Sequence, residues 1–325
     1  YRVKSAEFPL GFLSNDWQKG ITVLEINSNN TCNLACSMCN SNFSTAWLKY
    51  EKQINMDASY STYIALLNYA SANANPISVV EQLKNIDLTF LNQVIFKGGE
   101  PFMNPDFLLC LQYFLEIGIL SNLSIGLNTN GTILNKEVEN IKQLLSKADE
   151  VIFSVSVDGV DEVQTYIRHS PKDFASIANI EKFIEFFDDM ENFNIQLLTS
   201  ISIYNIFSLD KIVKWWLGMR EKYKSSRRSG NHMKPAHHTY RLNHFVIEPK
   251  ILSIHVLDQK TINDLIQYYT NKDRNEYYKS VIVGLNAYEY LGDDMQLKMI
   301  DYTLDMDRIK GQDVFKAVPE LKPIF

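Results

Sequence analysis

Short apolar runs alternate with longer amphipathic segments through the first two thirds of the chain. The runs are rich in Val, Ile and Phe and predict five strands, at residues 21–26, 93–96, 123–127, 151–157 and 195–203. The longer segments predict helices at residues 106–117, 136–147, 174–189 and 209–220. Strands separated by helices of this length form parallel βαβ units with right-handed crossovers. The pattern therefore predicts an α/β fold, and it fits a closed or open barrel as well as a flat doubly wound sheet.

The last third of the chain has a different character. Residues 222–238 are polar, with Ser-Ser, Arg-Arg and His-His pairs, and predict an exposed linker. One or two short strands are predicted after the linker, at residues 244–247 and 252–256, and polar helices over residues 260–310. This part of the chain is therefore expected to be mainly helical.

Length and charge exclude several classes of protein. The 325 residues are enough for one large domain or two modest ones. We expect a barrel core over residues 1–220, and a linker, the final strands and a helical extension over residues 221–325. The net charge of −6 gives no overall positive field toward nucleic acid or anionic lipid. No apolar run approaches the roughly 20 residues that span a bilayer, so no membrane partner is expected.

Three of the four cysteines, Cys32, Cys36 and Cys39, follow the first predicted strand within eight residues. Disulfide scaffolds spread cysteines along small secreted chains, so this grouping indicates metal binding in a reducing cytoplasm. Three thiolates on a cubane of four irons leave one iron free to bind a small molecule. A structural zinc site would need a remote fourth ligand such as Cys110, but Cys110 lies on an apolar helix face that is typical of buried, unreactive cysteines. A cluster is the favoured interpretation.

Polar residues and glycines follow the later predicted strands. Residues 98–100 (Gly-Gly-Glu) come after the second strand and residues 128–131 (Asn-Thr-Asn-Gly) end the third. Adjacent glycines let backbone approach a ligand closely, although both segments also fit ordinary turns. Arg168 can donate two parallel hydrogen bonds to a carboxylate, and a surface ion pair is its alternative role. Because the carboxyl ends of parallel strands share one edge of the sheet, these groups are expected to surround one site.

The cysteine spacing C-x3-C-x2-C resembles the signature of the radical S-adenosylmethionine (radical SAM) superfamily, with Met38 at the usually aromatic position. The resemblance implies one 4Fe-4S cluster on Cys32, Cys36 and Cys39, and S-adenosylmethionine as a second cofactor, with Met38 near its adenine. The other residues that the resemblance assigns to the cofactor pocket are Gly98, Gly99, Glu100, Asn128, Asn130, Ser156, Asp158, Arg168 and Asn205. Glu100 would contact the amino group of the methionine moiety, and Arg168, or Asn205 in its place, the carboxylate.

The resemblance also implies a fold and an activity. The fold would be a partial (β/α)6 TIM-like barrel with a mainly helical C-terminal extension. One electron, supplied by an external flavodoxin- or ferredoxin-type reductant, would cleave S-adenosylmethionine to methionine and a 5′-deoxyadenosyl radical that abstracts hydrogen from a substrate. No cysteine follows Cys110, so the extension resembles a shortened "twitch" without auxiliary-cluster cysteines. That departure argues against dehydrogenase-type chemistry.

Three hypotheses about the substrate remain open. The twitch-like architecture resembles that of peptide modifiers, so a peptide or protein side chain comes first. A nucleotide or nucleic acid is the alternative, supported only by the basic residues 211–241 around Trp215 and Trp216. An amphipathic helix that buries one tryptophan, followed by a solvated loop, is the simpler interpretation of that segment. A metal-binding module without catalysis is the third hypothesis, but such a module would not need the Gly-Gly-Glu turn.

Overall fold

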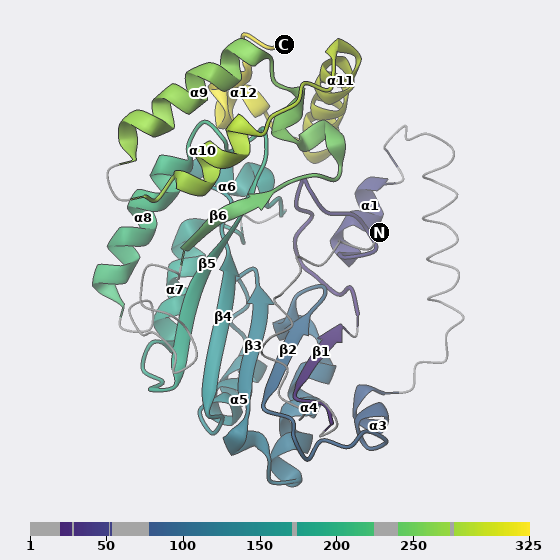
Figure 1. Cartoon of the computed structure of the whole chain (residues 1–325). Coiled ribbons are helices and arrows are strands. Elements are labelled where there is room, and N and C mark those ends of the chain that lie inside the picture. Colours follow the sequence, from purple (N-terminus) through teal and green to yellow (C-terminus); the bar gives the residue numbers. More distant parts are fainter. Residues whose placement is uncertain are drawn as a thin grey trace.

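The computed structural model describes residues 20–27, 29–51, 53, 78–170, 174–223, 240–273 and 276–325. A curled sheet of six parallel strands, in the spatial order β1 to β6, forms its centre (Figure 1). The strands are β1 (Val23–Asn27), β2 (Gln93–Lys97), β3 (Ser124–Thr129), β4 (Glu150–Ser156), β5 (Phe193–Ile201) and β6 (Tyr240–Phe245). Spatial order follows chain order without a reversal, whereas a doubly wound sheet reverses at a switch point. The predicted partial (β/α)6 TIM-like barrel is therefore confirmed.

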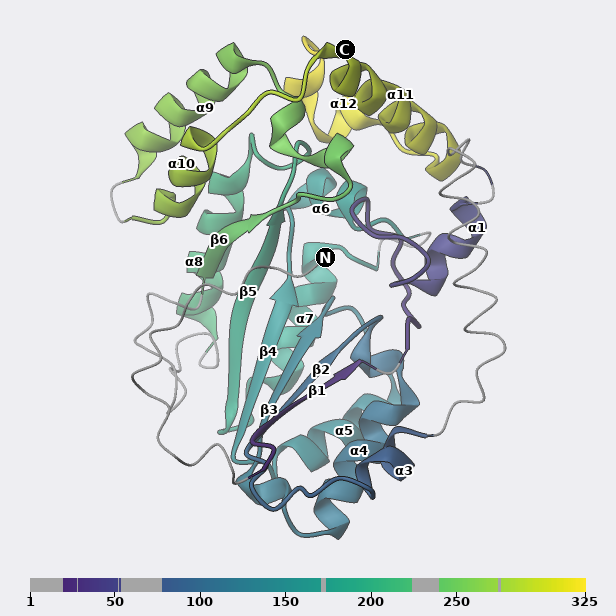
Figure 2. The same ribbon diagram turned by 45° about the vertical axis from the view of Figure 1, so that its right-hand side comes forward.

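Helices between the strands cover the outer face of the sheet (Figures 1 and 2). Those on the outer face are α4 (Pro105–Glu116), α5 (Lys136–Leu145), α7 (Ile177–Phe187) and α8 (Leu209–Lys222); α3 (Val79–Leu83) precedes β2, and α6 (Asp161–Ile167) follows β4. Side-chain caps define two of the starts. Asn104 accepts a hydrogen bond from the amide of Asp106 (3.0 Å), and Asn135 caps α5 in the same way.

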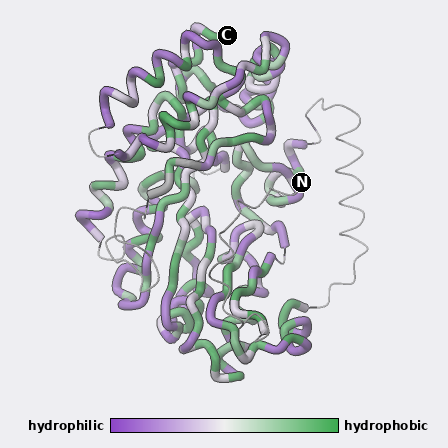
Figure 3. Tube along the Cα trace, viewed as in Figure 1, coloured by the Kyte–Doolittle hydropathy of each residue, from purple (hydrophilic) through white to green (hydrophobic). Residues whose placement is uncertain are grey.

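The main hydrophobic core fills the space between the sheet and these helices. Alternate strand residues point into it, as the complete burial of Val94 and Phe96 in β2 shows. Five phenylalanines pack edge-to-face or tilted at its centre: Phe102, Phe153, Phe183, Phe187 and Phe193. Each buried ring stabilises the fold by about 1.5–3 kcal/mol. Figure 3 shows hydrophobic and hydrophilic residues alternating along both the strands and the helices.

The end of the chain forms a group of helices beyond the carboxyl ends of the strands (Figure 2). They are α9 (Gln259–Lys272), α10 (Lys279–Asn286), α11 (Asp293–Lys310) and α12 (Val314–Ala317). Gly311 ends α11 in the left-handed conformation (φ 66°) that is common at helix C-termini. The predicted helical C-terminal region is confirmed. In the part of the chain that the structure covers, no helix is both long and apolar enough to cross a bilayer.

Two strand predictions near the end of the sheet need correction. The sixth strand is Tyr240–Phe245 instead of residues 244–247, and it pairs in parallel with β5. The strand predicted at residues 252–256 was wrong, because Lys250–Leu252 and Ile254–Val256 form two short 3-10 helices. The hydroxyl of Ser253 accepts a hydrogen bond from the amide of His255 (3.3 Å) and so starts the second turn. The alternating apolar residues that suggested a strand are buried against the core outside the sheet.

The division of the chain at residue 220 stays a proposal. Strand β6, which belongs to residues 221–325, is the sixth strand of the sheet. Most of the predicted linker, residues 224–238, lies outside the described residues.

Candidate cluster and cofactor site

The three clustered cysteines lie on the loop between β1 and the short helix α1 (Leu48–Glu51). The loop is tied to the last residue of α6 and to the segment that follows it. The amides of Ala35 and Ser37 donate hydrogen bonds to the carbonyls of His169 and Ile167, each at 2.8 Å. Pairing β1 with β2 and the loop with this segment places the cysteines at the carboxyl edge of the sheet, where ligands of parallel barrels gather.

One cavity of about 310 Å³ opens beside the loop. Most of the predicted site residues line it, namely Cys32, Cys36, Met38, Cys39, Gly98, Gly99, Asn128, Asn130, Ser156 and Arg168. Leu34, Phe43, Ser44, Thr129 and Ser200 also line it and were not predicted. Ser200 is a polar residue near the carboxyl end of β5, so the rule for parallel sheets could have found it. Glu100, Asp158 and Asn205 were predicted to contact the cofactor but are not among the residues that line the cavity.

The thiol positions fit a cluster held by three thiolates. None of the three cysteines is in a disulfide, and Cys110 is fully buried in the core face of α4, away from the cavity lining. Among the described side chains, no three His, Cys, Asp or Glu converge closely enough to hold a single metal ion. Thiolates on one zinc ion must lie about 3.8 Å apart, given a Zn–S bond of about 2.3 Å. A cubane instead binds each thiolate through a different iron, so its three thiolates need not meet at one metal ion.

Burial raises the pKa of Cys32 and of Cys39 to about 12, and it also raises the pKa of Cys36. The metal-free side chains are therefore neutral thiols at pH 7, and cluster binding must release their protons. Two donors are oriented toward the sulfur atoms. Asn130 Nδ2 lies 3.8 Å from Cys32 Sγ, and Arg168 Nη1 lies 3.9 Å from Cys36 Sγ. Such donors stabilise thiolate charge.

The glycine turn packs directly against the cysteine loop. Gly98 and Gly99 have φ values of +85° and +51°, which side chains disfavour. A Cβ atom at Gly98 would lie 1.9 Å from Asn27 Oδ1, and one at Gly99 would lie 2.4 Å from the carbonyl oxygen of Thr31. The turn therefore requires both glycines, because no side chain fits between it and the loop.

Glu100 is turned away from the cavity toward the end of β3. It is 1% exposed, and its carboxylate accepts hydrogen bonds from Thr129 Oγ1 and the amide of Asn130, each at 2.7 Å. Burial raises the pKa of Glu100 to about 7, although these donors oppose the shift. The Asn130 side chain in turn donates to Asn33 Oδ1 at 2.8 Å. Glu100 thus fixes the turn after β3 against the cysteine loop.

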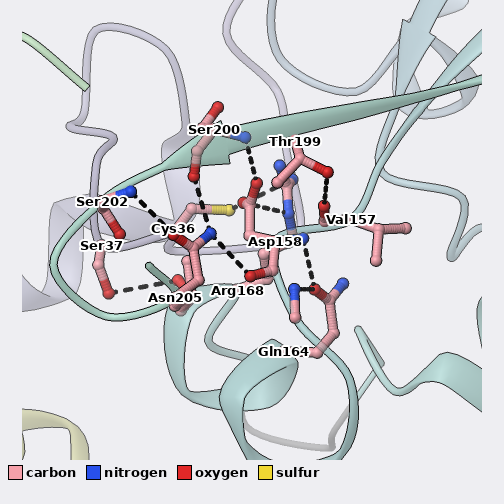
Figure 4. A network of polar contacts seen from close by, with 12 residues as sticks. Cys36, Ser37, Val157, Asp158, Gln164, Arg168, Thr199, Ser200, Ser202 and Asn205 are labelled. Atoms are coloured by element: carbon pink, nitrogen blue, oxygen red, sulfur yellow. Dashed lines mark hydrogen bonds and ion pairs between the residues drawn. The ribbon is translucent and has the colours of Figure 1, made fainter. Parts of the chain in front are cut away.

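Arg168 and Asp158 form a buried ion pair beside Cys36 (Figure 4). Arg168 Nε lies 2.8 Å from Asp158 Oδ2, and Asp158 Oδ1 accepts a hydrogen bond from the amide of Ser200 at 2.7 Å. Asp158 is completely buried and Arg168 is 9% exposed. The surface ion pair considered as the alternative role of Arg168 is therefore wrong, because both charges lie inside the protein and Arg168 lines the cavity.

Asn205 joins the end of β5 to the Asp158 segment (Figure 4). Its Nδ2 donates to the carbonyls of Asp158 (2.8 Å) and Ser200 (2.9 Å), and its Oδ1 accepts from the amide of Ser202 (2.8 Å). Gln164, which was not predicted, accepts the amide of Asp158 at 2.9 Å. In this network the side chains of Asp158, Gln164 and Asn205 all form hydrogen bonds to backbone groups. No sequence motif could have indicated the role of Gln164.

The described part of the basic segment behaves as an ordinary amphipathic helix. Trp216 is 2% exposed in the core, as predicted for one of the two tryptophans. The indole of Trp215 donates to Glu181 Oε1 at 2.9 Å, and Lys222 Nζ lies 3.8 Å from Glu181 Oε2. These residues belong to a surface recess between α7 and α8, separate in its lining from the cysteine cavity. Residues 224–239 of the segment lie outside the described ranges.

The fold and site together define an α/β half-barrel that gathers three cysteines, a glycine turn and a buried arginine around one cavity. A sequence model of the Radical SAM superfamily matches residues 26–199, which is more than half of the chain. The chain belongs to the radical SAM superfamily. No curated protein sequence matches it.

Several solved structures are similar to this chain. Native anSMEcpe with bound AdoMet aligns at 19% identity and a TM-score of 0.41, over 62% of this chain and 50% of that chain. Native anSMEcpe with bound AdoMet and Kp18Cys peptide aligns at 17% identity and a TM-score of 0.45, over 79% and 62%. Streptococcus suis SuiB bound to S-adenosylmethionine aligns at 15% identity and a TM-score of 0.38, over 77% and 44%. The chain thus spans between about two fifths and three fifths of the length of these solved proteins.

Proposed function

We propose that the chain binds one 4Fe-4S cluster through Cys32, Cys36 and Cys39, binds S-adenosylmethionine in the adjoining cavity, and modifies a peptide or protein side chain. When bound, the two cofactors supply a one-electron cleavage to methionine and a 5′-deoxyadenosyl radical, which takes hydrogen from the substrate. One observation carries the proposal. Residues from separate strand ends converge on one 310 Å³ cavity beside three thiols, in a chain of the radical SAM superfamily.

Arg168 is the proposed partner of the methionine carboxylate. Asp158 orients the guanidinium through Nε, and Arg168 is part of the cavity wall. An arginine held in this way loses little conformational freedom when it binds a carboxylate. Asn128 and Ser156 add polar groups from the ends of β3 and β4, and Met38 offers apolar surface for the adenine. In these assignments Asn205 positions Asp158 and does not contact the cofactor.

The amino group of S-adenosylmethionine is assigned to the backbone of Gly98 and Gly99. Both glycines line the cavity, and the absence of side chains lets a ligand approach their peptide groups. Glu100 would act indirectly, because both of its oxygens already accept hydrogen bonds from the turn after β3. In this proposal Glu100 positions Asn130, which contacts both Asn33 and the sulfur of Cys32.

The polar concave face of the barrel supports a peptide substrate. Asn128, Ser156 and Ser200 line the cavity, and residues two or four positions earlier in the same strands share their face of the sheet. That face carries linked polar pairs. Gln196 Nε2 donates to Ser154 Oγ at 2.7 Å, for example. A peptide must satisfy a donor and an acceptor at each residue, and a half-buried polar wall next to the cofactor cavity can do so.

The helical extension over residues 221–325 is proposed to close the barrel mouth as a twitch-like cap. Helices α9–α12 lie beyond the strand ends that carry the site (Figure 2), and exclusion of water protects a reactive radical. The electron donor would be an external flavodoxin- or ferredoxin-type protein. A reducing cytoplasm is the proposed compartment, because the three cysteines must remain free thiols until the cluster binds.

Iron stoichiometry tests the cluster assignment. After anaerobic reconstitution we expect about four irons per chain from one cubane. Cys36→Ala should abolish iron binding, and Cys110→Ala is the matched control that should retain it, because Cys110 lies outside the cavity lining. Seven or eight irons per chain, or stoichiometric zinc in their place, would contradict the assignment.

Deuterium transfer tests the substrate class. The reconstituted protein is reduced in the presence of S-adenosylmethionine and a peptide library with deuterated side chains, and products are analysed by mass spectrometry. We expect 5′-deoxyadenosine that carries deuterium, together with a modified peptide. Transfer from a deuterated oligonucleotide pool, with none from the peptides, would replace the proposal by the nucleic-acid alternative.

A further inference from the structure

Lys310, the last residue of α11, reaches the cysteine loop from the C-terminal extension. It is 9% exposed, and its Nζ donates a hydrogen bond to the carbonyl of Ala35 at 2.9 Å, one residue before Cys36. The same Nζ lies 4.2 Å from the centroid of the Trp47 ring. The Trp47 indole donates to the carbonyl of Cys36 at 3.0 Å. Lys310 therefore contacts the backbone and the aromatic side chain that hold the central cysteine.

A small hydrophobic cluster joins α11 to this loop. Its buried members are Ala35, Trp47, Tyr50 and Met306, and Cys39 packs against it. Lys310 Nζ also lies 5.8 Å from the centroid of the Tyr50 ring. The ammonium is thus enclosed on the side of the loop where two cysteines are anchored, in a setting where water screens charge weakly.

No carboxylate within the described ranges forms an ion pair with Lys310. Asp307, one turn earlier in α11, uses Oδ2 to accept a hydrogen bond from the amide of Val314 at 2.7 Å, and its carboxylate attracts the Lys310 ammonium without an ion-pair contact. A buried ammonium without a carboxylate partner is costly, and here a carbonyl oxygen and two aromatic faces are its contacts. Its charge therefore has no ion-pair partner among the described residues, and it acts on the neighbouring cysteines.

We propose that Lys310 sets the reduction potential of the cluster on Cys32, Cys36 and Cys39. Reduction adds one electron from an external donor, makes the cluster more negative by one unit, and forms or breaks no bond. A fixed positive charge nearby stabilises the reduced state more than the oxidised state. Lys310 is not among the residues that line the cavity. It therefore acts through the cluster, as a positioning residue, and does not contact the substrate. The assignment goes beyond the proposed function, because it holds for any substrate.

The test is a redox titration of the reconstituted full chain, followed by electron paramagnetic resonance, without S-adenosylmethionine or substrate. In Lys310→Met we expect the ratio of reduced to oxidised cluster at a fixed solution potential to fall about tenfold, equivalent to a shift of about 59 mV for one electron. Lys310→Arg keeps the charge and should stay near the parent value. Lys298→Met is the matched control, an exposed lysine on the same helix, and should not shift the potential.

Lys310→Gln separates charge from loop support, since its amide can still donate to Ala35 but carries no charge. We expect the same direction of shift in this variant, with iron content unchanged. An unshifted potential in Lys310→Met and Lys310→Gln with a full complement of iron would overturn the proposal. Loss of iron in both variants but not in Lys310→Arg would also overturn it, and would assign Lys310 to building the loop. Because no substrate is present, these outcomes are independent of whether the peptide assignment holds.

Discussion

Two cations reach the cysteine loop from different parts of the chain, and they are compensated in different ways. Arg168, at the end of α6 in the barrel, pairs with the fully buried Asp158 at 2.8 Å. Lys310, at the end of α11 in the extension, contacts a carbonyl oxygen and aromatic rings. Burial lowers the pKa of Lys310 to about 8, with the thiolate forms of Cys36 and Cys39 and the Asp307 carboxylate opposing the shift.

The difference separates two tasks. An arginine whose Nε is paired with a carboxylate keeps a fixed orientation and little net charge. This arrangement suits the binding of a ligand carboxylate by the remaining N–H donors of the guanidinium. A lysine without an ion-pair partner has little geometric specificity, but less of its charge is offset, which suits a redox centre. In the proposed assignments, the barrel therefore supplies the binding geometry of the site, and the extension supplies charge to the cluster.

The largest expected effect is on folding stability. Arg168→Ala leaves the Asp158 carboxylate buried without its cation, so the metal-free protein should lose about 3–5 kcal/mol of unfolding free energy. Lys310→Met leaves no buried charge behind and should cost less than half as much. Urea unfolding of the two variants measures this contrast. Equal losses would show that Lys310 and Arg168 are compensated alike.

Glu100 extends the contrast to a buried acid that has hydrogen-bond donors but no ion pair. Its pKa rises from an ordinary value near 4.5 to about 7 on folding, because burial disfavours the charge. The folded state then binds more protons at Glu100 than the unfolded state between these values, so the contribution of Glu100 to stability is fully present below about pH 4.5 and is lost as pH rises to about 7. The expected loss is about 3 kcal/mol.

Unfolding of metal-free protein across this pH range, compared with Glu100→Gln, checks the assignment of the effect to Glu100. The glutamine variant should lack this component of the pH dependence. A pH profile that the substitution leaves unchanged would show that the hydrogen bonds from Thr129 and Asn130 keep Glu100 ionised.

Cofactor affinity gives the next effect. In the double variant Arg168→Gln, Asp158→Asn both buried charges are removed, so the stability lost in Arg168→Ala should be largely regained. Affinity for S-adenosylmethionine should still fall about 10- to 100-fold, because a charged hydrogen bond contributes about 1.5–3 kcal/mol. Lys310→Met should bind the cofactor normally. Titration calorimetry on reconstituted protein separates these results, and normal affinity in the double variant would move the carboxylate partner elsewhere in the cavity.

The sheet and most of the cavity lining could be predicted from sequence because both depend on local signals. Apolar runs placed the first five strands, and residues at the ends of parallel strands must meet at one edge. Side-chain direction is not a local signal. Glu100 and Asn205 stand where the motif order puts them, but each turns to neighbouring backbone or side chains instead of the cavity.

Lys310 shows why other parts of the site could not be predicted from the sequence. A lysine in the last turn of a helix, followed by glycine, is ordinary, because it complements the helix dipole and precedes a common C-terminal cap. Its partner Ala35 lies 275 positions earlier, and no spacing rule connects the two. The predicted strand at residues 252–256 was wrong for a related reason, since alternating burial also arises in consecutive 3-10 turns that pack on a core.

The smallest effect is expected for exposed cations, which complete the comparison with Arg168 and Lys310. Lys211 and Lys214 lie exposed on α8, beside the recess that contains Trp215. Replacing both by Ala should change stability by less than about 0.5 kcal/mol, because exposed charges contribute little. Retention of RNA on the protein should be weak and should not change.

If α8 instead lined a nucleic-acid path, the loss of two phosphate contacts would flatten the slope of log Kobs against log salt by about 1.4–1.8. A salt titration of binding to labelled single-stranded RNA measures that slope, and a flattening of this size would favour the nucleic-acid alternative over the peptide substrate.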